Sequence, residues 1–219
     1  MLFRGSFAGA YYETQLRLME DQDRIRPLPI DTSLPVDTGW DLGMADQTAI
    51  WFVQPYRETY RLVGYYENNG EGLSHYVQYV ASWADKNKVR LGDHYAPHDI
   101  AVREFSGEGK SRLQVAAQLG LRFRVVKRHS IEDGIEVVRN FLSTCYADPD
   151  KLGKGWECLK SYCKEWDDAN QVFRSRPLHN WASHGADALR TYAMGRKRLR
   201  GDSSKPPVTY SSAYNIFDT

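Results

Sequence analysis

The sequence predicts an α/β domain in which helices cover both faces of one mixed β-sheet. Two features of the 219-residue chain support this. Three strand-like runs, VDTGWDL, TAIWFVQPY and TYRLVGYYEN, are separated only by short turn segments, which indicates an antiparallel meander. Shorter strand-like runs then alternate with helical segments, which is typical of parallel strands joined by helices. The hydrophobic content of 42% is sufficient for one sizeable core.

An N-terminal segment precedes this sheet. Apolar residues at roughly helical spacing predict an amphipathic helix over residues 8–24. Pro27, Pro29 and Pro35 then favour an extended segment over residues 25–36. The meander follows directly, with turns expected at GMAD and QPYRE.

The remainder of the chain is mainly helical. In chain order we expect a helix over 73–87, a strand ending in a turn in VRLGDHYAPHD, a helix over 110–119 that ends at Gly120, a strand over 122–127, a long helix in SIEDGIEVVRNFLSTCY, a helical piece in WECLKSYCKEW, a hairpin in NQVFRSRPL and a last helix in WASHGADALRTYAMGRKR. The long helix starts with a Ser-x-x-Asp capping signature. We therefore divide the chain into a helix and linker (1–34), a main domain (35–200) and a flexible Ser/Pro-rich tail (201–219).

The composition favours a cytosolic protein without a membrane segment. The chain has three cysteines without paired short spacing, which argues against a disulfide framework and fits a reducing compartment. No apolar run approaches the roughly 18 residues needed to cross a bilayer. The N-terminus also lacks the apolar stretch of a signal peptide.

Basic residues are gathered in two places although the net charge is only +1. One group lies in the middle of the chain, and a second group follows SHGADALR and comprises Arg190, Arg196, Lys197, Arg198 and Arg200. Basic flanks around an acidic centre can attract phosphates and still hold a metal ion. We expect Lys110, Arg112 and Arg190 to contact phosphate groups of a nucleic acid.

Three acidic residues are the strongest candidates for a functional site. Asp41 and Asp99 follow apolar, strand-like runs, and Asp187 lies among small apolar residues of the last helix. Carboxylates at such positions are costly unless they bind a partner, and oxygen ligands are those that Mg²⁺ and Mn²⁺ prefer. Two such ions bridged by carboxylates support phosphodiester hydrolysis, so we expect Asp41, Asp99 and Asp187 to be both metal ligands and catalytic residues.

Four other residues are candidates for supporting roles near this site. Asp37 lies four residues before Asp41 on the same strand, so the two side chains point to the same face of the sheet, and Asp37 is an alternative first ligand. Asp46 starts the next strand. His98 precedes Asp99, and His184 lies three residues before Asp187 on the same side of the helix. For each aspartate the alternative is an Asx turn, and for each histidine it is a structural role.

The element order and the acidic positions match the ribonuclease H-like fold, in which the first strand, the fourth strand and a late helix bring acidic residues together. WDLGMADQTAIWFVQ, APHDIAVREFSGEGKSR, SIEDGIEVVRNFL and PLHNWASHGADALR resemble the nuclease domain of large terminase subunits from tailed bacteriophages. The resemblance extends from about residue 6 to residue 195. It departs at Asn180, where relatives often carry Asp.

The resemblance implies an endonuclease that cuts concatemeric double-stranded viral DNA during packaging in the host bacterial cytoplasm. It also implies Asp41, Asp99 and Asp187 as ligands of two Mg²⁺ or Mn²⁺ ions. The implied partners are a terminase ATPase domain, a small terminase subunit and a portal. GEGKS lacks the first glycine of an ATPase phosphate-binding loop, so the chain corresponds to the C-terminal half of such a subunit.

Two alternatives remain open from the sequence. The same fold could belong to a junction resolvase, a transposase-like enzyme or an RNA–DNA hybrid nuclease. The chain could also be a non-catalytic module that docks on DNA or the portal through an inactive acidic pocket.

Overall fold

In the computed structural model, which describes residues 9–43, 47–102 and 109–196, a six-stranded mixed sheet forms the centre of the molecule. The strand order is β5-β4-β1-β2-β3-β6. The strands are β1 (Val36–Leu42), β2 (Thr48–Tyr56), β3 (Thr59–Asn68), β4 (Leu91–Ala96), β5 (Phe123–Val125) and β6 (Cys145–Ala147). β1, β2 and β3 are antiparallel, whereas β4, β5 and β6 join by parallel pairing. The predicted mixed sheet is confirmed.

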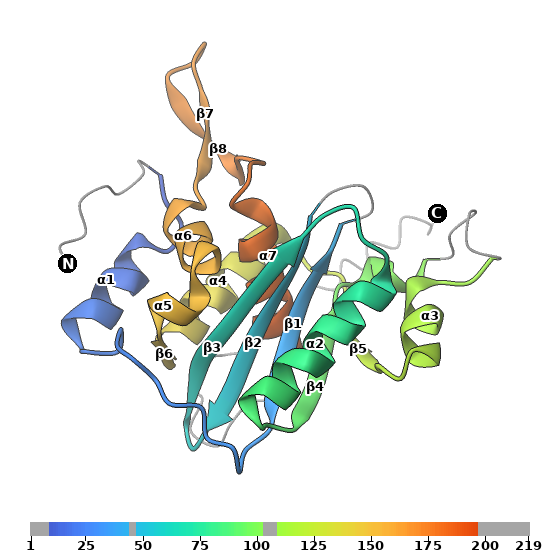
Figure 1. The fold of residues 1–219 in the computed structure, drawn as a ribbon. Helices are drawn as coiled ribbons and strands as arrows, with labels where there is room; N and C mark the ends of the chain where they lie inside the picture. Colours follow the sequence, from blue (N-terminus) through green and yellow to red (C-terminus); the bar gives the residue numbers. More distant parts are fainter. Residues whose placement is uncertain (1–8, 44–46, 103–108, 197–219) are drawn as a thin grey trace, which may run out of the picture.

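Helices cover both faces of this sheet, as expected. The helical elements are α1 (Glu13–Asp21), α2 (Leu73–Asn87), the 3-10 helix η1 (His98–Ala101), α3 (Arg112–Gln118), α4 (Ile131–Leu142), α5 (Pro149–Leu152), α6 (Lys154–Ser161) and α7 (Ser183–Gly195). α2 crosses one face, and α7 lies on the opposite face with α4 behind it (Figure 1).

Strand β2 explains why the chain needs two helical layers. Ile50 and Phe52 point into the core under α2, whereas Ala49, Trp51 and Val53 point into the core under α7. All five side chains are fully buried, so the strand is apolar on both faces. This is the physical reason why TAIWFV is a continuous apolar run rather than an alternating one.

Gly39 on β1 allows α7 to lie directly on the sheet. A Cβ atom at this position would lie 2.9 Å from the Ala188 carbonyl oxygen and closer still to Cβ of Tyr192. The Trp51 indole donates a hydrogen bond to the Gly185 carbonyl oxygen (2.7 Å), which fixes the start of α7 against β2. These contacts set the height of α7 above the sheet.

Several predicted boundaries are confirmed and three are wrong. The three meander strands and the helix over 73–87 agree with the structure. The N-terminal helix, expected over 8–24, spans only Glu13–Asp21, because Asp23 adopts the left-handed conformation just beyond it.

The long helix that starts after Ser130 ends at Leu142 and does not continue through CY. Ser143 and Thr144 hydroxyls donate to backbone carbonyls of the last turn, which competes with the continuing helix. Cys145–Ala147 instead forms the edge strand β6, paired in parallel with β3.

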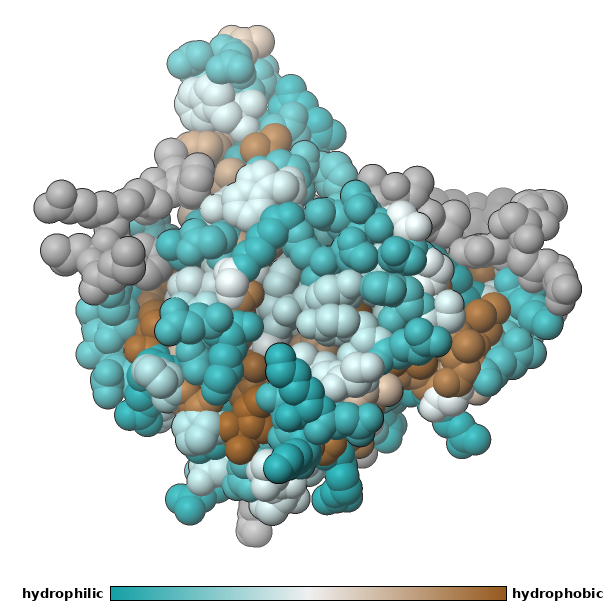
Figure 2. Space-filling model, viewed as in Figure 1, coloured by the Kyte–Doolittle hydropathy of each residue, from teal (hydrophilic) through white to brown (hydrophobic). Residues whose placement is uncertain are grey.

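The helical piece in WECLKSYCKEW also ends earlier than expected, at Ser161. Lys164–Asp167 forms strand β7, which pairs with β8 (Val172–Pro177) in a hairpin. The expected hairpin near NQVFRSRPL therefore exists, but it uses KEWD as its first strand. The hairpin stands away from the body and is mostly hydrophilic in the space-filling view (Figures 1 and 2).

The N-terminal helix shares the core of the main domain. Leu16 and Met19 are buried with α4 and α7 residues, and Arg24 donates to the carbonyl oxygens of Leu142 (2.8 Å) and Cys145 (2.7 Å). The boundaries after residues 34 and 200 stay predictions, and the tail over 201–219 lies outside the described residues. No helix in the described part of the chain is long and apolar enough to span a membrane.

Candidate active site

The candidate site lies at the edge of the sheet where the parallel strands β1 and β4 end. Asp41 is the second-last residue of β1, and Asp99 lies in η1, three residues after β4 ends. β1 and β4 are neighbours with Gly39 opposite Tyr95, so both carboxylates leave the sheet at the same edge. Sites of α/β folds commonly form at this edge of a parallel pair.

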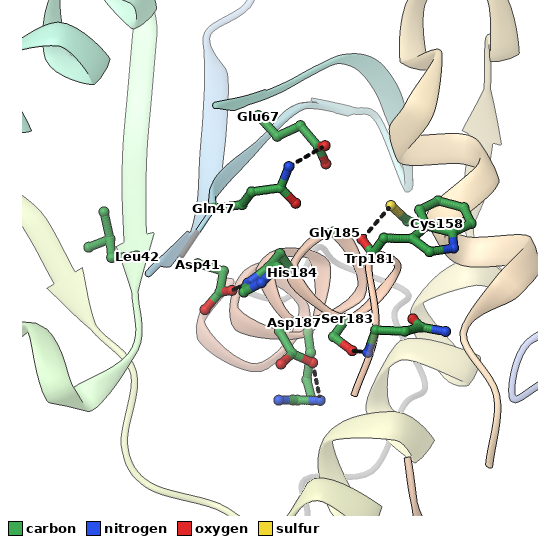
Figure 3. A network of polar contacts seen from close by, with 12 residues as sticks. Asp41, Leu42, Gln47, Glu67, Cys158, Trp181, Ser183, His184, Gly185 and Asp187 are labelled. Carbon is green, nitrogen blue, oxygen red and sulfur yellow. Dashed lines mark hydrogen bonds and ion pairs between the residues drawn. The ribbon is translucent and has the colours of Figure 1, made fainter. Parts of the chain in front are cut away.

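Helix α7 brings two further groups to Asp41. His184 Nδ1 lies 2.9 Å from Asp41 Oδ2, although the residues are 143 positions apart in the chain. Asp187 follows one turn later on α7 and is close enough that the Asp41 carboxylate affects its titration. Figure 3 shows Asp41, His184 and Asp187 together along the first turns of α7.

The surroundings of Asp187 are partly buried and charged. Arg190 Nη1 forms an ion pair with Asp187 Oδ1 at 2.7 Å, and the Tyr162 hydroxyl donates to the same oxygen at 3.5 Å. Burial raises the pKa of the Asp187 carboxyl above its ordinary value, and Asp41 adds to the rise, whereas Arg190 opposes it. A further cation beside Asp187, in addition to Arg190, would therefore favour the ionised form of Asp187.

Asp99 is exposed on η1. Within residues 9–43, 47–102 and 109–196, no group of three or more His, Cys, Asp or Glu side chains is close enough to hold a metal ion. The structure thus places His184 on Asp41, with Asp187 close enough to feel the Asp41 charge, and Asp99 follows β4 at the same edge of the sheet.

The other predicted supporting residues have different positions. Asp37 points to the same face of the sheet as Asp41, the face that carries α7, as predicted. It lies near the start of β1, however, whereas Asp41 lies near its end. Its carboxylate accepts from the Asp93 amide (2.8 Å) and the Tyr192 hydroxyl (3.4 Å), which indicates a structural role. His98 is exposed on η1, and Asp46 lies outside the described residues.

The three predicted phosphate contacts also differ in position. Arg112 donates from Nη1 to the Leu42 carbonyl oxygen (2.7 Å), next to Asp41, and borders a pocket of about 290 Å³ with Gly43, Thr48 and Glu71. Lys110 precedes α3 nearby in the chain. Arg190, in contrast, has a side chain only 14% exposed and lies inside the ion pair with Asp187.

Two residues at the site were not anticipated from the sequence. Tyr162, after α6, contacts Asp187 and also accepts from Arg190 Nη1 (3.2 Å). Glu67 on β3 lies across Ala49 from Asp41, with its side chain 9% exposed and paired with Lys154. Gln47 donates to the same carboxylate at 3.3 Å (Figure 3). Neither residue has a local sequence pattern that separates it from ordinary strand or loop residues.

Asn180 contributes to the start of α7. Its side-chain oxygen accepts from the Ala182 backbone amide at 2.9 Å, and its backbone amide donates to the Ser183 hydroxyl at 3.0 Å. An aspartate could accept the same amide hydrogen bond. Asparagine and aspartate at this position are therefore compatible with the same local structure.

No protein-family model and no curated protein matches the sequence. Solved structures match it closely in fold. A large terminase from a thermophilic bacteriophage, in complex with ATP-gamma-S, aligns with a TM-score of 0.63 at 18% identity, covering 84% of this chain and 45% of that one. The chain therefore spans less than half of that phage protein.

Isolated nuclease domains match over most of their own length. The large terminase nuclease from thermophilic phage G20c with bound magnesium aligns with a TM-score of 0.54 at 14% identity, covering 85% of this chain and 98% of that one. The g2p nuclease domain from bacteriophage SPP1 with bound Mn gives a TM-score of 0.51 at 16% identity, covering 72% and 85%. The chain therefore has the ribonuclease H-like fold of the large terminase nuclease domains.

Proposed function

We propose that this chain is the metal-dependent endonuclease domain of a terminase that packages viral DNA. The observation that carries the proposal is the placement of Asp187 and the His184–Asp41 hydrogen bond at the carboxyl edge of a terminase nuclease fold, where the Asp41 charge acts on Asp187. The expected substrate is concatemeric double-stranded DNA in the host bacterial cytoplasm. The expected partners are an ATPase domain, a small terminase subunit and a portal.

The donor atoms at this site suit a hard divalent cation. Asp41 and Asp187 supply carboxylate oxygens, and Asp99 could supply a third from the same edge. Such a donor set suits Mg²⁺ or Mn²⁺, the metals bound in the G20c and SPP1 nucleases. Two ions are expected, and when bound they would activate water and offset charge on the scissile phosphodiester.

The remaining residues of the site would position these carboxylates and the substrate. His184 would hold Asp41 in one orientation, and Arg190 with Tyr162 would do the same for Asp187. Arg112, beside the end of β1, and Lys110, two residues before it, would contact DNA phosphates. No described helix presents an obvious base-reading surface, so low sequence specificity is expected.

Nicking of supercoiled plasmid in the presence of Mn²⁺ tests the proposal. Asp41→Ala, Asp99→Ala and Asp187→Ala should each abolish nicking, because each removes a carboxylate ligand. Asp85→Ala, an exposed aspartate on α2, is the matched control and should retain activity. Full activity in all three variants would overturn the proposed site.

The same assay distinguishes the substrate. Linear duplex DNA should be cut at least as well as a four-way junction or an RNA–DNA hybrid. Preferential cleavage of either alternative would indicate a junction resolvase or a hybrid nuclease with this fold. Metal-independent DNA binding without cleavage would indicate a docking module.

A further inference from the structure

A second pocket lies at the opposite end of the sheet from the acidic site. It has a volume of about 520 Å³, within the range of small-molecule sites, and includes Arg26, Tyr56, Arg57, Arg61 and Tyr146 in its lining. Tyr56 ends β2, seven residues from Ala49, the partner of Asp41, so the two sites are separated by roughly 23 Å along the strand. The pocket is therefore independent of the acidic pair.

The charge of this pocket is suited to an anion. Its lining contains three arginines and one carboxylate, that of Glu58. In the described part of the chain, neither Arg57 nor Arg61 forms an ion pair within 4 Å, although the Arg61 charge helps to lower the pKa of Asp31, and Arg26 pairs with the exposed Asp23 at 3.4 Å. Guanidinium groups bind phosphate through parallel N–H donors, so three of them around one pocket favour a phosphate-bearing ligand.

The pocket also has aromatic walls that are ordered by these arginines. The Arg61 guanidinium lies 3.5 Å from the centre of the Tyr56 ring and donates to the Pro29 carbonyl oxygen at 3.1 Å. The Arg26 guanidinium lies 5.2 Å from the centre of the Tyr146 ring. In each contact a planar guanidinium group faces a tyrosine ring. A nucleobase is also planar and stacks on tyrosine rings and on guanidinium groups, so it can extend such a stack.

The β2–β3 turn holds the third arginine in an unusual backbone conformation. Arg57 has φ of +54°, in the left-handed region where glycine or asparagine is the usual residue. The Thr59 hydroxyl donates to the Tyr56 carbonyl oxygen at 2.9 Å and closes this turn. The Arg57 guanidinium lies 5.5 Å from the centre of the Tyr56 ring and so lines the pocket beside this aromatic wall.

We propose that this pocket binds a nucleoside phosphate, either as a free nucleotide or as the phosphorylated end of a DNA strand. The phosphate would contact Arg57 and Arg26, and the base would stack against the Tyr56–Arg61 and Tyr146 walls. This inference does not depend on the acidic site, and either proposal can fail without the other.

Isothermal titration calorimetry of the whole chain with deoxyadenosine 5′-monophosphate, in EDTA and low salt, tests the proposal. Binding is expected, with inorganic phosphate and unphosphorylated deoxyadenosine each about tenfold weaker, because each lacks one half of the recognised group. A 5′-phosphorylated tetranucleotide that binds more tightly than the mononucleotide would identify a strand end as the source. A weaker one would identify the free nucleotide.

The key variant is Arg57→Asn, which removes the charge and suits the positive φ, so a folding defect cannot explain lost binding. It should weaken nucleotide binding about tenfold, whereas Arg17→Gln, an equal charge change on the exposed face of α1, should not. The double variant Asp41→Ala/Asp187→Ala should bind the nucleotide normally. No detectable binding, equal binding by Arg57→Asn, or tighter Arg57-dependent binding of a glutamate-rich peptide would overturn the proposal.

Discussion

At the scale of single residues, the hydrogen bond between His184 and Asp41 defines the candidate site most sharply. It joins α7 to the end of β1 and leaves Asp41 with a fixed orientation. A residue that holds a metal-binding carboxylate in place affects metal affinity as well as turnover.

We therefore expect His184→Ala to reduce plasmid nicking by about 10- to 100-fold and to raise the Mn²⁺ concentration needed for half-maximal activity. His179→Ala is the control, because His179 is exposed and its ring only lies near that of His184, 5.8 Å away. Wild-type nicking at low Mn²⁺ in His184→Ala would show that the histidine merely packs beside the site.

A second residue, His94 on β4, makes the stability of the fold depend on pH. Its ring nitrogen Nδ1 and the Thr38 hydroxyl are 2.6 Å apart inside the sheet, and the side chain is buried. Burial lowers the pKa of His94 to about 4. Because the folded-state pKa is below the unfolded value of about 6.5, the unfolded chain binds the extra proton first.

His94 should therefore contribute stability above pH ~6.5 that is lost as the pH falls toward about 4. The full loss is on the order of 3 kcal/mol. Urea unfolding at about pH 7, about pH 5.5 and about pH 4.5 should show a shallower pH dependence in His94→Gln than in the wild type. His98→Gln, at an exposed position, should follow the wild type. Parallel curves for His94→Gln and the wild type would contradict this assignment.

At the scale of elements, the contact between α7 and β1 positions the residues of the candidate site. It depends on a glycine in the strand and on small residues in the helix. The helix carries both His184 and Asp187, so a change in its distance from the sheet moves both with respect to Asp41.

Gly39→Ala should destabilise the protein by roughly 3 kcal/mol, because the added methyl meets the Ala188 carbonyl and the Tyr192 Cβ, which are parts of the helix itself. It should also reduce nicking at temperatures where the variant is folded. Gly72→Ala is the matched control, since the nearest atom to its added methyl is 3.9 Å away. Thermal unfolding of both variants provides the measurement, and equal melting temperatures would show that α7 can shift without cost.

At the scale of the whole molecule, the net charge is close to zero, but the basic residues are unevenly distributed. The net charge is +1, yet Lys110 and Arg112 precede or start the helix next to the acidic edge. The basic residues from 197 to 200 lie outside the described residues. The proposed DNA binding would depend on displaced counterions rather than on total charge.

Cleavage should accordingly fall steeply with salt. Between about 50 and 200 mM NaCl we expect the rate at subsaturating DNA to drop by at least about tenfold. The double variant Lys110→Gln/Arg112→Gln should show a slower rate and a smaller salt slope. A flat salt response in the wild type would contradict phosphate contacts near this edge.

The elements that could be predicted are those in which the pattern of apolar and polar residues within the element indicates which side chains are buried. β1, β2, β3 and α2 have apolar patterns long enough to indicate their type, and their predicted boundaries agree with the structure. β6 and β7 were missed because each is short and follows a helical segment closely, so that each was predicted as the end of that helix. Such short strands form because a partner strand is present, and that partner is distant in sequence or follows a turn.

The sequence by itself determined the mixed sheet with helices on both faces and the placement of Asp41, Asp99 and Asp187 at element ends or on a helix face. Only the tertiary structure showed that Asp41, and not Asp37, lies beside His184, because the packing of α7 on β1 sets that contact. It also placed Arg190 in an internal ion pair and added Tyr162 to the site. A local sequence pattern indicates whether the residues of one segment are buried or exposed. These contacts depend instead on how α7 crosses the sheet, and that crossing is set by packing between segments that are distant in the sequence.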